Sequence, residues 1–95
     1  MNKAIYFKGD RCSVCTALYP KIKTHFEEEF PFMDFQTIQG DQLEKVAAQY
    51  GVYSAPVLLV FFEGKEHSRF VRNFSTRDID EKIARVYHLL FDEVG

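Results

Sequence analysis

The sequence predicts an α/β fold in which a four-stranded mixed sheet, in βαβαββα order, is flanked by helices on both faces. Three features predict it. In the first half of the chain, short apolar segments alternate with segments of helical periodicity. The continuous apolar run Val57 to Phe62 is typical of a central strand that is covered on both faces. A Glu-Gly turn then joins this run to a more polar strand.

The chain opens with a strand and a helix. We expect the first strand at Lys3 to Phe7, closed by Gly9 and Asp10, and a helix from about Ser13 to Glu28. The apolar residues at helical spacing are Leu18, Ile22 and Phe26. Pro31 then blocks continuation of the helix, because a proline removes a backbone donor and clashes with the preceding turn.

A second strand and a second helix follow. The strand is predicted at Phe32 to Ile38, and Gly40 and Asp41 should open the helix, which Gly51 stops. The apolar positions of this helix are Leu43, Val46, Ala47 and Tyr50. Because a helix joins the first two strands, these strands should be parallel and connected by a right-handed crossover.

The second half of the chain predicts a β-hairpin followed by a capped helix. Glu63 and Gly64 suit the turn, and Glu66 to Phe74 should return as an outer, antiparallel strand. Ser75 can cap the last helix, because Asp78 follows it at the spacing of a capping box. The apolar face of this helix is predicted to comprise Ile79, Ile83, Val86 and Leu90.

Length and composition limit the possible functions. The 95 residues, 46% of them apolar, suffice for one core, so we expect a single domain over residues 1–95 that needs no disulfide staple. The net charge of −2, without a long basic block, argues against a nucleic acid partner. The first apolar run, Ala4 to Phe7, is too short for a signal peptide or a membrane span, so we expect a cytoplasmic protein with no membrane partner.

Cys12 and Cys15 are the candidate catalytic residues. In the cytoplasm structural disulfides are rare, so a CxxC pair is more often redox-active or metal-binding. Cys12 falls where the first strand turns into the first helix, and the unpaired N–H groups at a helix start favour thiolate over thiol. Cys15 falls one turn further in, within reach but shielded, as dithiol exchange requires. Arg11 adds positive charge beside Cys12 and is a candidate for tuning the thiol pKa.

At these residues the sequence resembles the thioredoxin superfamily. The match is carried by Cys12, Cys15 and Pro20, and by the stretch YGVYSAPVLLVFFEGK from Tyr50 to Lys65. The resemblance implies a thioredoxin-like fold, in which Pro20 kinks the helix after the cysteines and Pro56 follows a cis peptide bond. A proline after a small residue and before a buried strand is also a candidate for a cis bond on physical grounds. The resemblance further implies that Ala55 offers its backbone to an extended substrate peptide.

The chain departs from the family pattern near the motif. Arg11 stands in place of the signature Trp, and Ser13 and Val14 replace the usual Gly-Pro. Tyr6 replaces the family's buried carboxylate on the strand before the motif, and Asp10 is only a candidate to replace it as proton acceptor for the resolving thiol. No Gly-Gly-Asp glutathione site follows the hairpin, which weakens a glutaredoxin interpretation. Family potentials run from roughly −270 to −120 mV, and a cytoplasmic location favours the reducing direction.

Other interpretations of the cysteines remain beside redox chemistry. A structural zinc site needs four ligands, and the other candidates, His25, His67 and His88, are not paired at the usual spacing. Transfer of Cu(I) suits a two-cysteine loop, but Pro56 and the long apolar run fit poorly with the smaller fold of copper chaperones. Two inert, buried cysteines are a third interpretation, which suits Cys15 better than Cys12.

The sequence therefore predicts a thiol–disulfide oxidoreductase with Cys12 as the nucleophile and Cys15 as the resolving thiol. Ala55 and Pro56 would shape the substrate groove. The expected partners are protein disulfides and, as the electron donor, a reductase or a small thiol. We expect a monomer with no cofactor and no metal. The alternative function is a non-catalytic binding or redox-switch module on the same fold.

Overall fold

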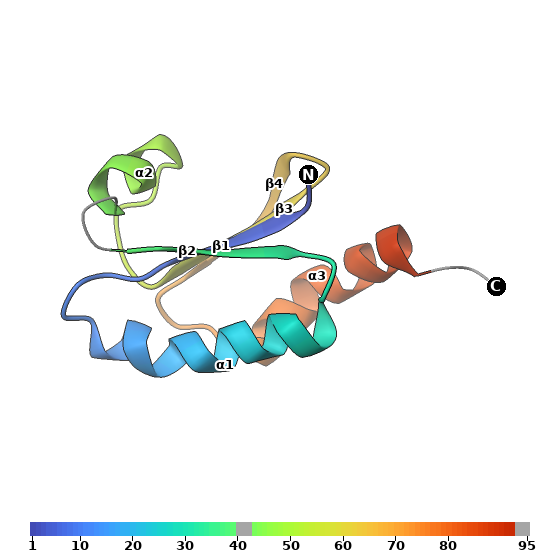
Figure 1. Cartoon of the computed structure of the whole chain (residues 1–95), viewed down its shortest axis with the longest axis horizontal. Coiled ribbons are helices and arrows are strands. Elements are labelled where there is room, and N and C mark those ends of the chain that lie inside the picture. Colours follow the sequence, from blue (N-terminus) through green and yellow to red (C-terminus); the bar gives the residue numbers. More distant parts are fainter. Residues whose placement is uncertain (40–42, 93–95) are drawn as a thin grey trace.

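The computed structural model describes residues 1–39 and 43–92 as helices and strands around one sheet (Figure 1). The strands are β1 (Lys3–Phe7), β2 (Asp34–Ile38), β3 (Val57–Phe62) and β4 (Lys65–Val71). The helices are α1 (Ser13–Glu29), α2 (Leu43–Gln49) and α3 (Thr76–Phe91). The predicted element order and the α/β fold class are confirmed. No helix in this part of the chain is long and apolar enough to cross a bilayer.

The strands lie in the order β2-β1-β3-β4, which places the first strand of the chain inside the sheet. β1 runs parallel to β2, as the crossover helix predicts, and β3 is antiparallel to both β1 and β4. Phe7 at the end of β1 lies opposite Val57 at the start of β3, and Val57 lies opposite Val71 at the end of β4. The end of β1, the start of β3 and the end of β4 therefore lie together at the same end of the sheet.

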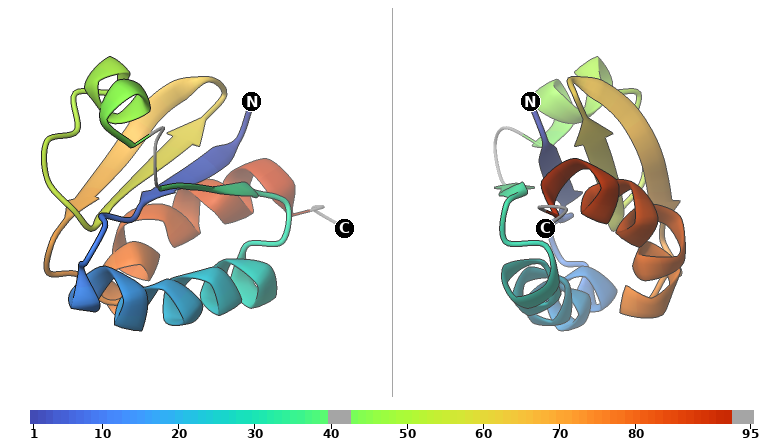
Figure 2. Two further views of the ribbon diagram at one scale, coloured as in Figure 1. Left: turned by 60° about the vertical axis from the view of Figure 1, so that its left-hand side comes forward. Right: turned by 90° about the vertical axis from the view of Figure 1, so that its right-hand side faces the viewer.

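Each face of the sheet has its own apolar core. α1 and α3 cover one face and α2 covers the other (Figure 2). Successive residues of β1 enter different cores: Tyr6 packs on the side of α1 and α3, and Phe7 packs on the side of α2. All residues of β3 are buried, because both of its faces are covered. This explains why its sequence is a continuous apolar run rather than an alternating one.

α1 has the full predicted length and runs through Pro20. Ile22 and Phe26 are buried against the sheet, whereas Pro20 is exposed, so its ring takes no space in the core. A proline inside a helix lacks the N–H that would donate to the carbonyl four residues earlier, but the packed apolar face holds the helix together. α1 ends where the Phe30 N–H donates to the Phe26 carbonyl at 2.9 Å.

α3 begins with the predicted capping box. The Ser75 hydroxyl accepts a hydrogen bond from the Asp78 backbone N–H, and the Asp78 carboxylate accepts one from the Ser75 N–H at 2.8 Å. The predicted apolar face is correct for Ile79 and Ile83 but wrong for Leu90, which is 42% exposed. Tyr87 is buried instead, because positions 79, 83 and 87 form one stripe at four-residue spacing.

Two strands are shorter than predicted. β2 begins at Asp34 rather than Phe32, because residues 31–33 form a turn in which the Met33 N–H donates to the Phe30 carbonyl at 3.0 Å. Phe32 is 68% exposed in this turn. β4 ends at Val71 rather than Phe74, because the next residue adopts a left-handed backbone conformation that leaves the strand.

The second helix differs from the prediction at its end. The predicted start at Gly40 and Asp41 lies outside the described residues. Tyr50 follows α2 rather than belonging to it: its N–H donates to the Ala47 carbonyl at 3.0 Å, the tighter bonding pattern common at helix ends. Gly51 stops the helix as predicted, with a left-handed φ of 68°.

Candidate active site

Cys12 and Cys15 lie where β1 gives way to α1, and they form a disulfide. Their Cα atoms are 5.2 Å apart. Between strand and helix the chain turns at Arg11, whose φ of 56° is left-handed. Just before this turn Gly9 passes close to the loop that precedes β3, since an added Cβ would lie 3.1 Å from the Cβ of Ala55. The cysteine motif and that loop therefore pack against each other at Gly9.

The start of α1 supplies a hydrogen-bond donor to the first sulfur. Cys12 is the N-cap residue of the helix, and its Sγ accepts a hydrogen bond from the Cys15 backbone N–H at 3.1 Å. A backbone donor and the positive end of the helix dipole both stabilise negative charge on this sulfur. Cys12 is partly exposed, whereas Cys15 is fully buried. The first cysteine of the pair is thus partly accessible to solvent and the second is shielded.

Cys12 lines a groove of about 510 Å³ beside the loop that precedes β3. Ala55 and Pro56, joined by a cis peptide bond, line the same groove. The other lining residues are Arg11, Ser13, Val14, Arg72 and Asn73. The structure thus brings Cys12, Ala55, Pro56 and Arg11 to one surface, while Cys15 lies behind that surface.

The side chain beneath the motif is a phenol. Tyr6 is fully buried, and its hydroxyl donates a hydrogen bond to the Cys15 carbonyl at 2.9 Å. Burial raises the pKa of Tyr6 to about 12, so the hydroxyl stays protonated at neutral pH. Asp10 is exposed, so it does not supply the buried carboxylate that the motif lacks. Among residues 1–39 and 43–92, no charged side chain is buried.

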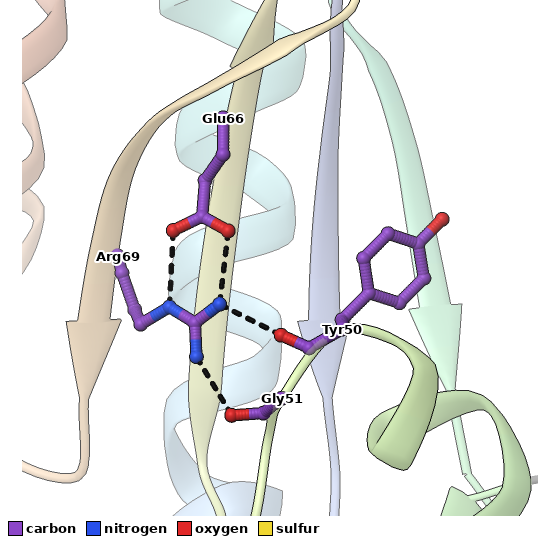
Figure 3. A network of polar contacts seen from close by, with 4 residues as sticks. All are labelled: Tyr50, Gly51, Glu66 and Arg69. Carbon is purple, nitrogen blue, oxygen red and sulfur yellow. Dashed lines mark hydrogen bonds and ion pairs between the residues drawn. The ribbon is translucent and has the colours of Figure 1, made fainter.

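The loop that carries Ala55 is fixed at its first residues by an arginine from β4 (Figure 3). The guanidinium of Arg69 donates to the carbonyls of Tyr50 at 2.7 Å and Gly51 at 2.9 Å. The same group donates two hydrogen bonds to the Glu66 carboxylate, at 2.9 and 3.0 Å, which hold its plane. These bonds tie the end of α2, and with it the start of the loop, to the sheet.

The histidines lie apart from the cysteines. His25 on α1 pairs with Asp80 on α3 at 2.6 Å, and His88 pairs with Asp92 at 3.0 Å. The Nδ1 atom of His67 forms a hydrogen bond with the hydroxyl of its neighbour Ser68 at 2.7 Å. In the described residues, no group of three or more His, Cys, Asp or Glu side chains is placed to hold a metal ion.

Sequence reasoning missed Arg72 and Asn73, which line the groove from the end of β4. A signal for them exists in the hairpin. A turn at Glu63 and Gly64 makes β4 antiparallel to β3, so the end of β4 must return to the start of β3 beside Pro56. The Arg72 N–H indeed donates to the Pro56 carbonyl at 2.8 Å. The exact residue depends on a register shift near Val60, which the sequence does not announce.

Comparison with known proteins agrees with this geometry. The Thioredoxin family model matches residues 2–85. The chain is 33% identical over 85 residues to the thioredoxin-like protein YdfQ of Bacillus subtilis, covering 90% of this chain and 75% of that protein. It is 37% identical over 65 residues to thioredoxin-1 of Saccharomyces cerevisiae, covering 68% of this chain and 62% of that protein. The structure of thioredoxin 1 from Thermosipho africanus aligns with a TM-score of 0.80 at 34% identity, over 93% of this chain and 97% of that one.

Proposed function

The chain belongs to the thioredoxin family, and we propose that it is a thiol–disulfide oxidoreductase that uses Cys12 and Cys15 to reduce disulfides in protein substrates. One observation carries the proposal: the Cys12 sulfur accepts a backbone N–H at a helix start and faces a groove. The sulfur bonded to it is buried. This combination supplies a stabilised nucleophile and a second thiol within reach.

The proposed reaction passes two electrons from the dithiol to the substrate. The Cys12 thiolate attacks one sulfur of the substrate disulfide, so a mixed disulfide forms and the other substrate sulfur leaves as a thiolate, which takes a proton from solvent. Cys15 gives its proton to solvent and attacks the Cys12 sulfur, which releases the second substrate thiolate. The protein is left with the Cys12–Cys15 disulfide. A reductase or a small thiol then returns the two electrons.

Residues around the cysteines have proposed roles in binding. Ala55 and Pro56 shape the groove, with Ala55 pairing through its backbone with an extended substrate segment. Such pairing tolerates many side chains, as a general reductant requires. Arg11 adds a positive charge to the groove that contains Cys12. We propose that the protein works in the cytoplasm as a monomer, with residues 1–95 forming one domain.

Reduction of insulin disulfides by dithiothreitol tests the proposal. Wild-type protein should accelerate precipitation of the reduced chains over dithiothreitol alone, and Cys12→Ser should remove the acceleration, because no other sulfur faces the groove. Serine at position 12 keeps the helix cap, so this variant is also a folding control. An absence of acceleration by the wild type refutes the enzyme and leaves the binding or redox-switch module.

Trapping assigns the roles of the two sulfurs. Cys15→Ser lacks the resolving thiol, so it should accumulate mixed disulfides through Cys12 when incubated with protein disulfides. Non-reducing gels and mass spectrometry identify the bonded cysteine. Accumulation on Cys12→Ser instead means that the roles are reversed.

A further inference from the structure

Two arginines from different parts of the chain line the same groove as Cys12. Arg11 comes from the turn before α1 and Arg72 from the segment after β4. The other described residues that line the groove are neutral, so this part of the groove carries positive charge, although the chain as a whole has a net charge of −2. Because the local charge has the opposite sign to that of the whole chain, it does not follow from overall composition.

The backbone at both arginines is held in an uncommon conformation. Arg11 has a φ of 56° and Arg72 a φ of 64°, both in the left-handed region that residues other than glycine seldom adopt. The third such residue that the structure describes, Glu63, belongs to the hairpin turn. Unfavourable backbone conformations of this kind cluster at sites that bind or react.

The Arg72 backbone is bonded to the loop that would bind the substrate. Its N–H donates to the Pro56 carbonyl at 2.8 Å, and the next N–H, from Asn73, donates to the Val71 carbonyl at 2.8 Å. The base of the Arg72 side chain is therefore fixed relative to Ala55 and Pro56. Arg11 directly precedes Cys12 in the chain, so the base of its side chain lies next to that residue.

Neither side chain is engaged with a carboxylate within residues 1–39 and 43–92. Both are exposed, and the ion pairs found there involve other residues. The carboxylate next in sequence, that of Asp10, lines a separate hollow on the other side of the loop, beside α2. The two guanidinium groups are thus open to a ligand in the groove.

From these observations we propose that Arg11 and Arg72 form a carboxylate subsite, which makes the groove selective for disulfides that carry an acidic group close to the bonded sulfur. A guanidinium binds a carboxylate through two parallel hydrogen bonds, and here two arginines line the groove that contains Cys12. The carboxylate could belong to an acidic residue beside a protein cysteine or to a small anionic disulfide such as oxidised glutathione. The inference rests on the proposed oxidoreductase function and names its preferred substrates.

The test uses matched disulfide peptides that differ only in the residue next to the cysteine, which is Glu, Gln or Lys. At low salt, wild-type kcat/KM should fall from the Glu to the Gln to the Lys peptide, and added salt should reduce the differences. Arg72→Gln and Arg11→Gln should each lower the Glu-to-Gln ratio by about three- to fivefold, and the double variant should bring it close to one. The ratio is the readout, because any change in Cys12 reactivity affects both peptides equally.

Arg85→Gln is the matched control. It removes the same charge from an exposed position on α3 that does not line the groove, so the ratio should stay at the wild-type value. A second arm compares oxidised glutathione with its carboxyl-esterified form. Preference in the peptide arm assigns the subsite to protein segments, and preference in the glutathione arm alone assigns it to a small disulfide.

Equal rates for the Glu and Gln peptides and for both forms of glutathione overturn the subsite. A ratio that Arg11→Gln and Arg72→Gln leave unchanged overturns it as well. Failure of the oxidoreductase proposal looks different, because the wild type would then reduce none of the peptides, whatever their charge.

Discussion

Gly9→Ala should disturb the contact between the cysteine motif and the loop that carries Ala55. Gly9 is outside the left-handed region, so its backbone accepts alanine. The new Cβ, however, would lie 3.1 Å from the Cβ of Ala55, closer than an ordinary contact of 3.4–4 Å. Because both atoms are attached directly to the backbone, the motif and the loop must move apart by at least about 0.3 Å.

The expected effects follow from this displacement. Overpacking costs about 1–3 kcal/mol, and the smaller conformational freedom of the unfolded alanine chain offsets about 0.4–1 kcal/mol of that cost. We therefore expect the free energy of unfolding in urea to fall by about 0.5–2 kcal/mol. The same shift moves Ala55 relative to Cys12, and kcat/KM for insulin reduction should fall by about three- to tenfold.

Gly64→Ala is the matched control. Its φ of 82° makes alanine unfavourable by about 1 kcal/mol, but no atom of the described residues lies within 4 Å of the added Cβ. Gly64 lies in the hairpin turn after β3, whereas Pro56 and the groove lie before β3, at its other end. This variant should therefore lose stability and keep its activity. The reasoning is refuted if Gly9→Ala retains wild-type stability and activity, or if Gly64→Ala loses as much activity as Gly9→Ala.

Three further changes probe the contacts that support the site. Tyr6→Phe removes the hydroxyl bonded to the Cys15 carbonyl and should lower the free energy of unfolding by about 1 kcal/mol. Burial raises the pKa of Tyr6 from 10.0 to about 12, so the stability that its protonated hydroxyl contributes is complete below pH 10 and is lost as the pH rises toward 12. Unfolding curves of Tyr6→Phe should show a smaller loss of stability over this pH range. Arg69→Gln removes the hydrogen bonds that lower the pKa of Glu66. In the wild type this ion pair adds stability above pH 4.5 that is lost on further acidification, so the variant should lose less stability than the wild type in acid titrations. Ser75→Ala should lower the melting temperature by an amount equivalent to about 1 kcal/mol through loss of the α3 cap.

Each of these three predictions would be contradicted by a specific result. A Tyr6→Phe protein with the same alkaline fall as the wild type means that another group titrates there. An Arg69→Gln protein whose acid unfolding matches the wild type shows that solvent screens the Glu66 pair completely. Wild-type melting of Ser75→Ala means that the capping box adds nothing to folding.

Local signals in the sequence predicted the elements well. The capping box at Ser75 and the Glu63-Gly64 turn each depend on residues close together in the chain, and both are present. The continuous apolar run of β3 predicted a strand covered on both faces, and every residue of it is buried. Such features need no knowledge of distant contacts.

The errors arose where tertiary packing decides the outcome. Phe32 has the hydrophobicity of a strand residue, but its N–H donates to the Tyr87 hydroxyl on α3 at 3.1 Å, in a turn that precedes the strand and leaves Phe32 exposed. Arg72 joins the groove only because a hairpin folds back on β3, and a register shift within that hairpin selects the residue. A single sequence carries no direct measure of either effect.

The hydrogen bond from Tyr6 to the Cys15 carbonyl also discriminates between alternative alignments of β1. A strand that is apolar on both sides gains almost as much from burial when it is displaced by one position as when it is aligned correctly. Displacement by one position would turn the Tyr6 hydroxyl toward the α2 side, away from its acceptor on α1. The hydroxyl would then be buried in an apolar core without a hydrogen-bond partner. The hydroxyl of Tyr6 thus raises the free energy of a shifted β1 register that burial of apolar side chains alone would hardly disfavour.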